Sequence, residues 1–291
     1  MLRLVIPKGS LEDQTLRLFE AADLHVRRGS SRDYHGTIDD ERVERVSLLR
    51  PQEIPTYIED GLFDLGITGR DWIEETGADV EVLASLEYAK SGTGRGVRVV
   101  LAVPNDHPAM SAKELPPGSR ISTEYVNLTK RYFADLGIDV RVVWSYGATE
   151  AKVPEIVDAI VDVTETGSTL RAHGMRIVET LLGSEVLLIA NRTSAADPVK
   201  RRAMDDVSTL LLGALRAEGR VLIKLNVTDE RLKELLGFVP AMKAPTVSRL
   251  SEGGYAVETV VAKREVNRLI PLLKEHGATD ILELPISKIV P

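Results

Sequence analysis

The chain has 291 residues, of which 43% are hydrophobic and 28% are charged, and it carries a formal net charge of −7 and no cysteine. This length allows about two or three domains with substantial cores. The negative charge balance does not suggest a nucleic-acid surface, and the lack of cysteine excludes disulfides, thiolate zinc sites and cysteine nucleophiles.

The first nine residues begin a strand directly and lack the pattern of a secretory signal. The longest apolar runs, such as residues 186–190, fall far short of the ~20 residues that span a bilayer. We therefore expect a soluble, cytoplasmic protein with neither a membrane nor a nucleic acid as partner.

Strand and helix signals alternate through the first two hundred residues, which predicts α/β layers with substantially parallel sheets. The first elements expected are a strand over 2–6, a helix capped by Ser10 and Asp13 to about 22, a helix between Pro51 and Gly61, and strands over 65–68 and 97–103. The segment 104–118 is the densest in proline, so we place a domain boundary near Pro104.

A second α/β unit is expected to follow. Its predicted elements are strands over 120–123, 140–144 and 159–163, with a helix over about 127–136. A break at Gly183 and the apolar run 186–189 suggest that the chain returns to the first sheet, before a long helix over about 198–218. The predicted core is thus two-lobed, with residues 1–103 and 184–218 in one lobe and 104–183 in the other.

After Gly219 the pattern changes. The expected order is strand, helix, strand, strand, helix, strand, over 221–227, 230–236, 246–250, 256–261, 265–276 and 280–284. This is the ferredoxin-like order, and residues 219–291 fit the size of a small separate domain.

The segment from Asp158 to Leu170 carries the strongest functional signal. An apolar strand leads into Thr166-Gly167-Ser168-Thr169, a turn that opens a helix and presents amides and hydroxyls where a phosphate is favoured. Acids stand beside it, at Asp158, Asp162 and Glu165, and carboxylates accept hydrogen bonds from sugar hydroxyls. An ordinary helix N-cap explains the turn alone about equally well, but with the acids a ribose 5-phosphate site is favoured.

Other strand-to-helix junctions are polar or basic, and parallel strands would bring them to one sheet edge, where α/β proteins bind ligands. The residues concerned are Lys8, Gly9, Gly69, Arg70, Asp71, Thr123, Tyr125 and Asn127. Two further basic candidates are Arg95, within the glycine-rich run 92–96, and Arg98, just after it. Taken singly, each is explained as well by a solvated charge or a tight turn.

Protein-held transition metals and common nucleophile motifs are not indicated. The five histidines show no paired ligand spacing, and neither a Gly-x-Ser-x-Gly nor a Gly-x-x-x-x-Gly-Lys-Ser/Thr motif is present.

The spaced combination of four motifs resembles the ATP phosphoribosyltransferase family over essentially the whole chain. The motifs are Pro7-Lys8-Gly9-Ser10-Leu11, Gly66-Ile67-Thr68-Gly69-Arg70-Asp71, Asp158 to Leu170, and Ala244-Pro245-Thr246-Val247. The resemblance is to the long form. It implies a periplasmic-binding-protein-like catalytic core and a ferredoxin-like, ACT-like regulatory domain. It also implies transfer of a phosphoribosyl group from phosphoribosyl pyrophosphate to ATP, with Mg²⁺, inhibition by histidine, and a hexamer built from dimers.

Carried over to this sequence, the resemblance implies roles for individual residues. Lys8, Arg70, Asp158 and Asp162 would be catalytic, with the two aspartates near the ribose or its Mg²⁺. The substrate-binding residues would be Gly9, Gly69, Asp71, Arg98, Thr123, Tyr125, Asn127, Glu165, Thr166, Gly167, Ser168 and Thr169. Met242, Thr246 and Asp280 would form the histidine site. The alternatives are a non-catalytic two-lobed small-molecule binding protein and a phosphoribosyltransferase with another acceptor.

Overall fold

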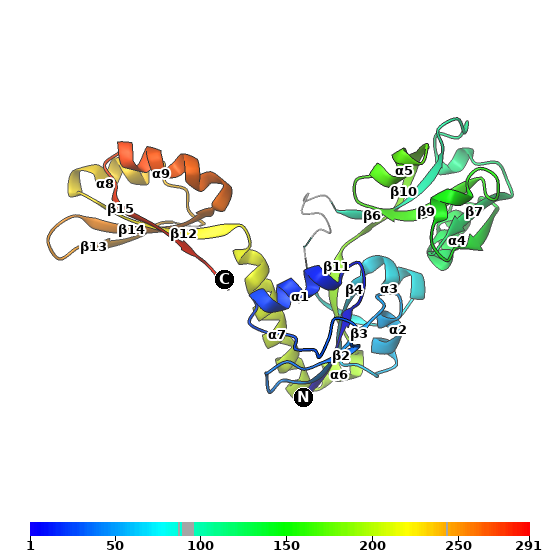
Figure 1. The fold of residues 1–291 in the computed structure, drawn as a ribbon, viewed down its shortest axis with the longest axis horizontal. Coiled ribbons are helices and arrows are strands. Elements are labelled where there is room, and N and C mark those ends of the chain that lie inside the picture. Colours follow the sequence, from blue (N-terminus) through cyan, green and yellow to red (C-terminus); the bar gives the residue numbers. More distant parts are fainter. Residues whose placement is uncertain (87, 89–95, 243) are drawn as a thin grey trace. The chain divides into compact units, whose positions relative to one another are not determined.

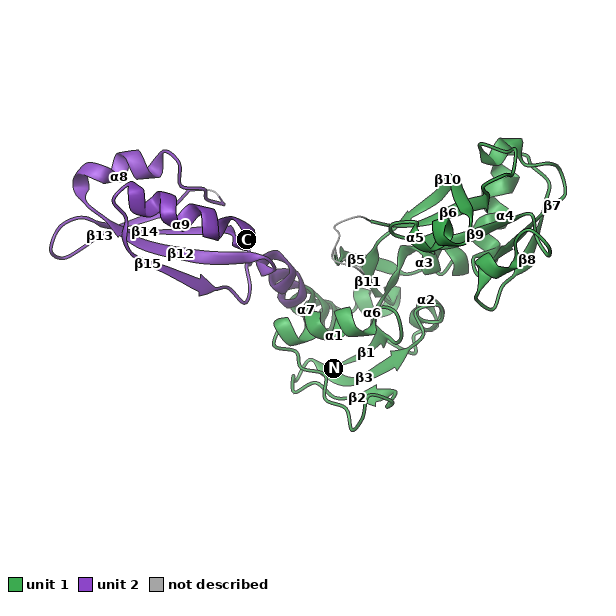
Figure 2. Ribbon diagram, turned by 45° about the horizontal axis from the view of Figure 1, so that its top comes forward, with its two compact units in different colours: residues 1–208 green, residues 209–291 purple. Residues whose placement is uncertain are grey.

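The computed structural model describes residues 1–86, 88, 96–242 and 244–291. The chain divides into two compact units, residues 1–208 and 209–291 (Figure 2). The first unit contains two sheets and the second contains one. Within the described residues, no helix combines the length and apolar character that crossing a bilayer requires.

The first sheet has the strand order β2-β3-β1-β4-β11-β5. Strands β2, β3, β4 and β11 of this sheet are labelled in Figure 1. Its strands are β1 (Leu2–Pro7), β2 (His35–Gly36), β3 (Val43–Leu49), β4 (Leu65–Gly69), β5 (Glu81–Ser85) and β11 (Val186–Ala190). Strand β1 is parallel to β3 and β4, whereas β11 is antiparallel to β4 and β5. Every residue of β4 and β11 is buried, as expected for apolar runs at the centre of a sheet covered on both faces.

Short helices follow the strands of this sheet. They are α1 (Glu12–Ala21), α2 (Ile54–Glu59), α3 (Arg70–Thr76) and α6 (Arg192–Ala196). A Cβ at Gly66 would lie within 3.1 Å of Val5, Ile54 and Ile58, so this glycine allows α2 to pack closely on β4 and β1. The predicted cap of α1 is wrong, because the N-cap is Leu11 and the Gly9 amide donates instead to the Glu12 carboxylate.

The second sheet has the strand order β10-β6-β9-β7-β8. Its strands are β6 (Val97–Pro104), β7 (Ser119–Thr123), β8 (Val140–Trp144), β9 (Ala159–Thr164) and β10 (Met175–Ser184). The helices α4 (Val126–Asp135) and α5 (Ser168–Ala172) follow β7 and β9, with short 3₁₀ helices at Ala112–Glu114 and Thr149–Lys152. Strand β7 is parallel to its neighbours β8 and β9, whereas β6 is antiparallel to its neighbours β9 and β10.

The predicted two-lobed plan is confirmed, but the strand over residues 97–103 was assigned to the wrong lobe. Strand β6 belongs to the second sheet, where Ala102 pairs with Ile160 of β9 and with Ile177 of β10. The proline-rich segment therefore follows the first strand of the second lobe and does not separate the lobes. The predicted return of the chain at residues 186–189 is correct, since β11 pairs with β4.

The second unit has the predicted ferredoxin-like order and an antiparallel sheet with the order β13-β14-β12-β15. Its elements are β12 (Arg220–Val227), α8 (Asp229–Leu236), β13 (Thr246–Arg249), β14 (Tyr255–Ala262), a 3₁₀ turn (Lys263–Glu265), α9 (Val266–Glu275) and β15 (Thr279–Pro285). Helix α7 (Pro198–Ala217) runs from the first unit into the second. Alternate residues of β12 are buried with Leu235, Leu269 and Leu273, so the two helices cover one face of the sheet.

Candidate active site

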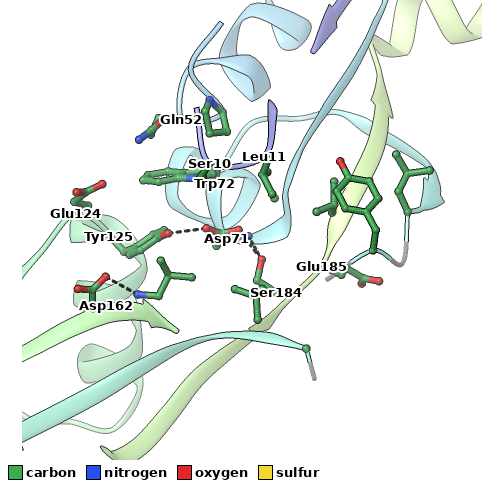
Figure 3. Close-up of a pocket in the computed structure, with 18 residues that line it drawn as sticks. Ser10, Leu11, Gln52, Asp71, Trp72, Glu124, Tyr125, Asp162, Ser184 and Glu185 are labelled. Atoms are coloured by element: carbon green, nitrogen blue, oxygen red, sulfur yellow. Dashed lines mark hydrogen bonds between the residues drawn. The ribbon is translucent and has the colours of Figure 1, made fainter. Parts of the chain in front are cut away.

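A cavity of about 570 Å³ lies in the first unit, lined by elements of both sheets (Figure 3). Ser10 lies in the turn after β1, Gly69 ends β4, and Asp71 lies in the first turn of α3. From the second sheet, Tyr125 is the N-cap of α4, just after β7, and Asp162 lies in β9. These positions lie at or just beyond the carboxyl ends of parallel strands, where α/β folds bind ligands. The junctions that follow β1, β4 and β7 therefore meet at this cavity, together with β9, as the sequence predicted.

Asp71 is the central side chain of this cavity. It is 6% exposed, and its carboxylate accepts hydrogen bonds from the Tyr125 hydroxyl at 2.7 Å and the Ser184 hydroxyl at 2.5 Å (Figure 3). The Tyr125 ring stacks on Trp72 with a centroid distance of 4.6 Å. Because an almost fully buried carboxylate needs such donors, Asp71 is fixed in one orientation.

The two tyrosines of the cavity are held in their neutral form. Burial, and next the charge of Asp71, raise the pKa of the Tyr125 hydroxyl above its ordinary value of 10. Burial raises the pKa of Tyr88 to about 12, and the Tyr88 hydroxyl lies 2.7 Å from that of Thr15. Both side chains therefore act as hydroxyl donors or acceptors at neutral pH and supply no charge to the cavity.

The loop at residues 165–169 forms a smaller pocket of about 220 Å³, lined by Glu165, Thr166, Ser168 and Thr169. Its walls include Val97 and Val163, which also line the large cavity, so the two spaces adjoin. The loop is held by its own hydroxyls. The Gly167 amide donates to Thr164 Oγ1 at 2.9 Å, and the Ser168 amide donates to Thr166 Oγ1 at 3.3 Å.

Gly167 is required both by its backbone conformation and by its surroundings. Its φ of +71° lies in the left-handed region, and a Cβ would meet Arg171 Nη1 at 3.0 Å and Ile177 Cδ1 at 3.1 Å. The added atom would thus press on the support of the loop and not on an anion held by it. Arg171 also donates to the Thr166 carbonyl at 3.0 Å, so displacing its guanidinium would disturb the loop.

The structure contradicts the roles predicted for Asp158. This residue precedes β9, whereas the loop follows that strand, so the two lie about 20 Å apart at 3.3 Å per residue. Its carboxylate accepts from the Arg120 amide and guanidinium, both at 2.8 Å. These bonds with Arg120 lower the pKa of Asp158. The residue thus ties β9 to β7 at the end of the sheet away from the loop.

Asp162 and Glu165 line the large cavity and the loop pocket, respectively. Asp162 also accepts a hydrogen bond from the Val163 amide at 2.7 Å (Figure 3). Thr123 is fully buried, and its hydroxyl accepts from the Tyr125 amide, so its contact is with the protein backbone.

The predicted basic residues are held by protein groups. Lys8 Nζ donates to the carbonyls of residues 31–33 at 3.2 to 3.4 Å and lies 4.3 Å from the centre of the Tyr34 ring. Arg70 is paired with Glu185 at 2.5 Å. Hydrogen bonds from Ser85 and then Arg70 lower the pKa of Glu185, which also lines the cavity. The charges of Lys8 and Arg70 are therefore positioned before any ligand binds.

Arg98 lies on β6 opposite Thr164 and Gly183, near the end of β9 that leads into the loop. Arg95 and the glycine-rich run before residue 96 lie outside the described residues. Gly9 has a φ of +98° in the turn between β1 and α1.

Sequence reasoning missed Glu75, which fastens α3 of the first lobe to α4 of the second. Its carboxylate accepts from the amides of Asn127 and Leu128, both at 2.9 Å, and caps the amino terminus of α4. Asn127 also donates its side-chain amide to the Glu75 carbonyl at 3.1 Å. The predicted substrate residue Asn127 is therefore engaged in joining the lobes. Ser184 and Glu185 were missed too, although this polar pair between two apolar runs was a visible signal.

The three predicted regulatory residues lie in the second unit. Met242 is 52% exposed, with its sulfur 3.6 Å from Arg220 Nη1, and Thr246 is exposed on the edge strand β13. Asp280 has a φ of +50° and accepts from the Asn226 side chain at 3.0 Å.

In the part of the chain that the structure describes, no group of three or more histidine or acidic side chains could hold a metal ion.

Together these features define a two-lobed α/β core, in which the loop at residues 165–169 lies beside the large cavity, and a ferredoxin-like domain that follows in the sequence. A family model described as ATP phosphoribosyltransferase matches residues 50–212, and one described as HisG, C-terminal domain, matches residues 217–288. The chain belongs to the ATP phosphoribosyltransferase family, in the form that carries the C-terminal domain.

Similar proteins agree with this assignment. An ATP phosphoribosyltransferase of Desulforudis audaxviator (strain MP104C) is 48% identical over 293 residues, covering 100% of this chain and 99% of the relative. The ATP phosphoribosyltransferase of Chlorobium phaeovibrioides (strain DSM 265 / 1930) is 46% identical over 291 residues, covering 100% of this chain and 98% of the relative. Among solved structures, the ATP phosphoribosyl transferase (HisG:HisZ) complex from Thermotoga maritima includes a chain that is 26% identical with a TM-score of 0.61. The match covers 72% of this chain and 96% of that one.

Proposed function

We propose that this chain transfers the phosphoribosyl group of phosphoribosyl pyrophosphate to N1 of ATP, giving phosphoribosyl-ATP and pyrophosphate, the first step of histidine biosynthesis. The observation that carries the proposal is the adjacency of the loop pocket and the large cavity, which share Val97 and Val163. A 5-phosphate in the first space leaves its ribose in the second. Family membership supports the same substrates.

In this arrangement the chain acts by positioning and electrostatics. Thr166, Ser168 and Thr169 would donate to the 5-phosphate, and Asp162 would accept from ribose hydroxyls. The charges of Lys8 and Arg70 would stabilise the departing pyrophosphate. Adenine N1 already has a lone pair, so the transfer requires no strong general base from the protein.

A divalent metal is expected for this family, and we propose Mg²⁺. Asp162 lines the cavity, and among the described residues no group of three or more histidine or acidic side chains could hold a metal ion. The donor set therefore fits an ion held mainly through substrate phosphates. When bound, Mg²⁺ would neutralise charge on the leaving pyrophosphate. Asp158 has no part in this, since it lies at the other end of β9.

The test is release of pyrophosphate by the purified full chain with ATP, phosphoribosyl pyrophosphate and Mg²⁺. Thr166→Val combined with Thr169→Val should raise the KM for phosphoribosyl pyrophosphate by about tenfold or more, since two hydrogen bonds are worth about 1–3 kcal/mol. Thr180→Val, at an exposed threonine of β10, should leave that KM unchanged. An unchanged KM in the double variant would remove the loop from the substrate site. Absence of pyrophosphate would favour a binding protein or another acceptor.

We further propose that the ferredoxin-like unit is an ACT-like domain that binds histidine as an inhibitor near Met242, Thr246 and Asp280. We also propose that the enzyme is a homo-oligomer, either a dimer or a hexamer built from dimers. Thr246→Ala with Asp280→Asn should weaken inhibition and leave the uninhibited rate unchanged. Asparagine is chosen because it tolerates the left-handed backbone at position 280. Full histidine sensitivity in this variant would contradict the assignment, and sedimentation would measure the oligomer.

A further inference from the structure

A second cavity, of about 530 Å³, lies in the first unit beside the large one. Trp144 at the end of β8 and Tyr146 just after it line this cavity, and they are 58% and 87% exposed. Their ring centroids are 4.4 Å apart. A single exposed aromatic needs no explanation, but two in contact on the wall of one cavity form a surface for a planar ligand.

This second cavity, called the aromatic cavity from here on, shares Gln52, Trp72 and Glu124 with the large cavity. Glu124 and Trp72 are drawn on the wall of the large cavity in Figure 3. The large cavity therefore adjoins the loop pocket through Val97 and Val163 and adjoins the aromatic cavity through these three residues. The three spaces match the parts of a reaction complex, namely a phosphate, a ribose and a flat aromatic ring.

The charge of the aromatic cavity indicates which part of a nucleotide it would accept. Its lining includes the carboxylates of Glu75 and Glu124, which repel phosphate. Glu75 is already bonded to the amides at the start of α4, whereas Glu124 stands at the border of both cavities. A carboxylate beside stacking rings suits a base that carries an amino group, and each stacked base gains about 1–3 kcal/mol.

We propose that this cavity binds the adenine of the acceptor ATP, with the ring against Trp144 and Tyr146 and the 6-amino group donating to Glu124. N1 is adjacent to the amino-bearing carbon of adenine. A base held by Glu124 at the border therefore presents N1 to the cavity in which the ribose lies. The inference rests on the proposed function and assigns to it the residues that recognise the acceptor base.

Fluorescence tests base binding without any reaction. The chain has two tryptophans, Trp72 and Trp144, so in a full-length Trp72→Phe variant Trp144 is the sole indole, and the phenyl ring keeps a partner for Tyr125. ATP alone should change this fluorescence saturably, and tripolyphosphate should not. Inosine triphosphate, which lacks the amino group, should bind at least about fivefold more weakly, and adding Glu124→Ala should reduce that difference. Equal responses to ATP and tripolyphosphate would overturn the inference.

Kinetics provide the second test. Trp144→Ala with Tyr146→Ala should raise the KM for ATP about tenfold or more, as expected from the loss of one stacked base, and should leave the KM for phosphoribosyl pyrophosphate within twofold. Phenylalanine at both positions should restore most of the affinity for ATP. The control is Ile156→Ala, which removes another exposed apolar side chain, 61% exposed, from the same lobe.

The outcomes separate this inference from the proposed function. If the unaltered enzyme releases pyrophosphate and the double alanine variant keeps its KM for ATP, the adenine assignment fails and the reaction stands. If the unaltered enzyme releases none, the reaction fails, and the fluorescence titration still decides whether an adenine nucleotide binds beside Trp144.

Discussion

Asp71 and Tyr125 are 54 positions apart in the sequence, and the tyrosine hydroxyl donates to the aspartate carboxylate at 2.7 Å. Asp71 lies in the first turn of α3, after a strand of the first sheet, and Tyr125 is the N-cap of α4, after a strand of the second. The second oxygen of the carboxylate accepts from Ser184, at the end of β10. One buried carboxylate thus joins three segments around the cavity, and the shape of the cavity depends on it.

Tyr125→Phe should lower the free energy of unfolding by about 1.5–3 kcal/mol, the usual worth of a buried hydrogen bond to a charged group. The ring and its stack on Trp72 remain, so the loss reports the hydroxyl alone. Urea unfolding at pH 7 measures it. Tyr34→Phe, at a tyrosine that is 58% exposed, should stay within about 0.5 kcal/mol of the unaltered protein. Equal losses in the two variants would show that the Asp71 bond adds no stability.

Gly69→Ala tests the same carboxylate from the other side. A Cβ at position 69 would overlap Asp71 Oδ1, which cannot turn away without losing its bonds to Tyr125 or Ser184. We expect a loss of about 1–3 kcal/mol in the free energy of unfolding, as for an overpacked core. Gly183→Ala is the matched control, because among the described residues only its own chain neighbours have atoms within 4 Å of the added Cβ. A neutral Gly69→Ala would mean that Asp71 has room to move.

Patterns of apolar residues predicted most elements, and the failures have identifiable physical causes. β3 and β5 were missed because charged or half-exposed residues interrupt their apolar patterns. Most of β10 was missed because it is half-exposed and its pairing with β6 shifts register twice. β6 was assigned to the wrong lobe because an apolar run specifies a strand but not its neighbours. Strand pairing depends on residues far away in the sequence, such as Ile160 beside Ala102.

The site was predicted in part for similar reasons. Asp71 and Tyr125 were named because each stands just beyond the carboxyl end of a strand, and Asp162 because it is an acid beside the loop. All three line the large cavity. Asp158 was grouped with the loop because it is close in sequence, but a strand of six residues separates them. Glu75 was missed since nothing local marks a half-buried helical glutamate as the cap of a helix 52 positions away.

Asp64 should make stability depend on pH. Its fully buried carboxylate accepts from Arg3, Lys200 and Ser194 at 2.7 to 3.2 Å. Burial would raise the pKa of Asp64, but the hydrogen bonds, first that of Arg3, outweigh burial and lower it below the ordinary 3.8. A carboxyl whose pKa is lowered by folding stabilises the fold above its ordinary pKa, and that contribution is lost as the pH falls towards the folded value.

Asp64→Asn should therefore lower the free energy of unfolding at pH 7. Breaking a fully buried ion pair costs about 3–5 kcal/mol, and we expect a loss of about 3 kcal/mol or less because Arg3 and Lys200 are partly exposed. The difference from the unaltered protein should stay constant down to about pH 5 and shrink below about pH 4. Urea unfolding at several pH values measures it, with the exposed Asp60→Asn as control. A difference that grows on acidification would contradict the assignment.

Gly167 and Gly174 flank α5 with nearly the same backbone, φ +71° and +70°, so alanine at either position should cost about 1–2 kcal/mol of stability. They differ in their surroundings. A Cβ at 167 meets Arg171 and Ile177, whereas at 174, within the described part of the chain, it meets nothing within 4 Å beyond its chain neighbours. Gly167→Ala should therefore also raise the KM for phosphoribosyl pyrophosphate about tenfold, and Gly174→Ala should leave it unchanged. A similar rise in both variants would show that KM follows general destabilisation of α5, and that the geometry of the loop does not set substrate affinity.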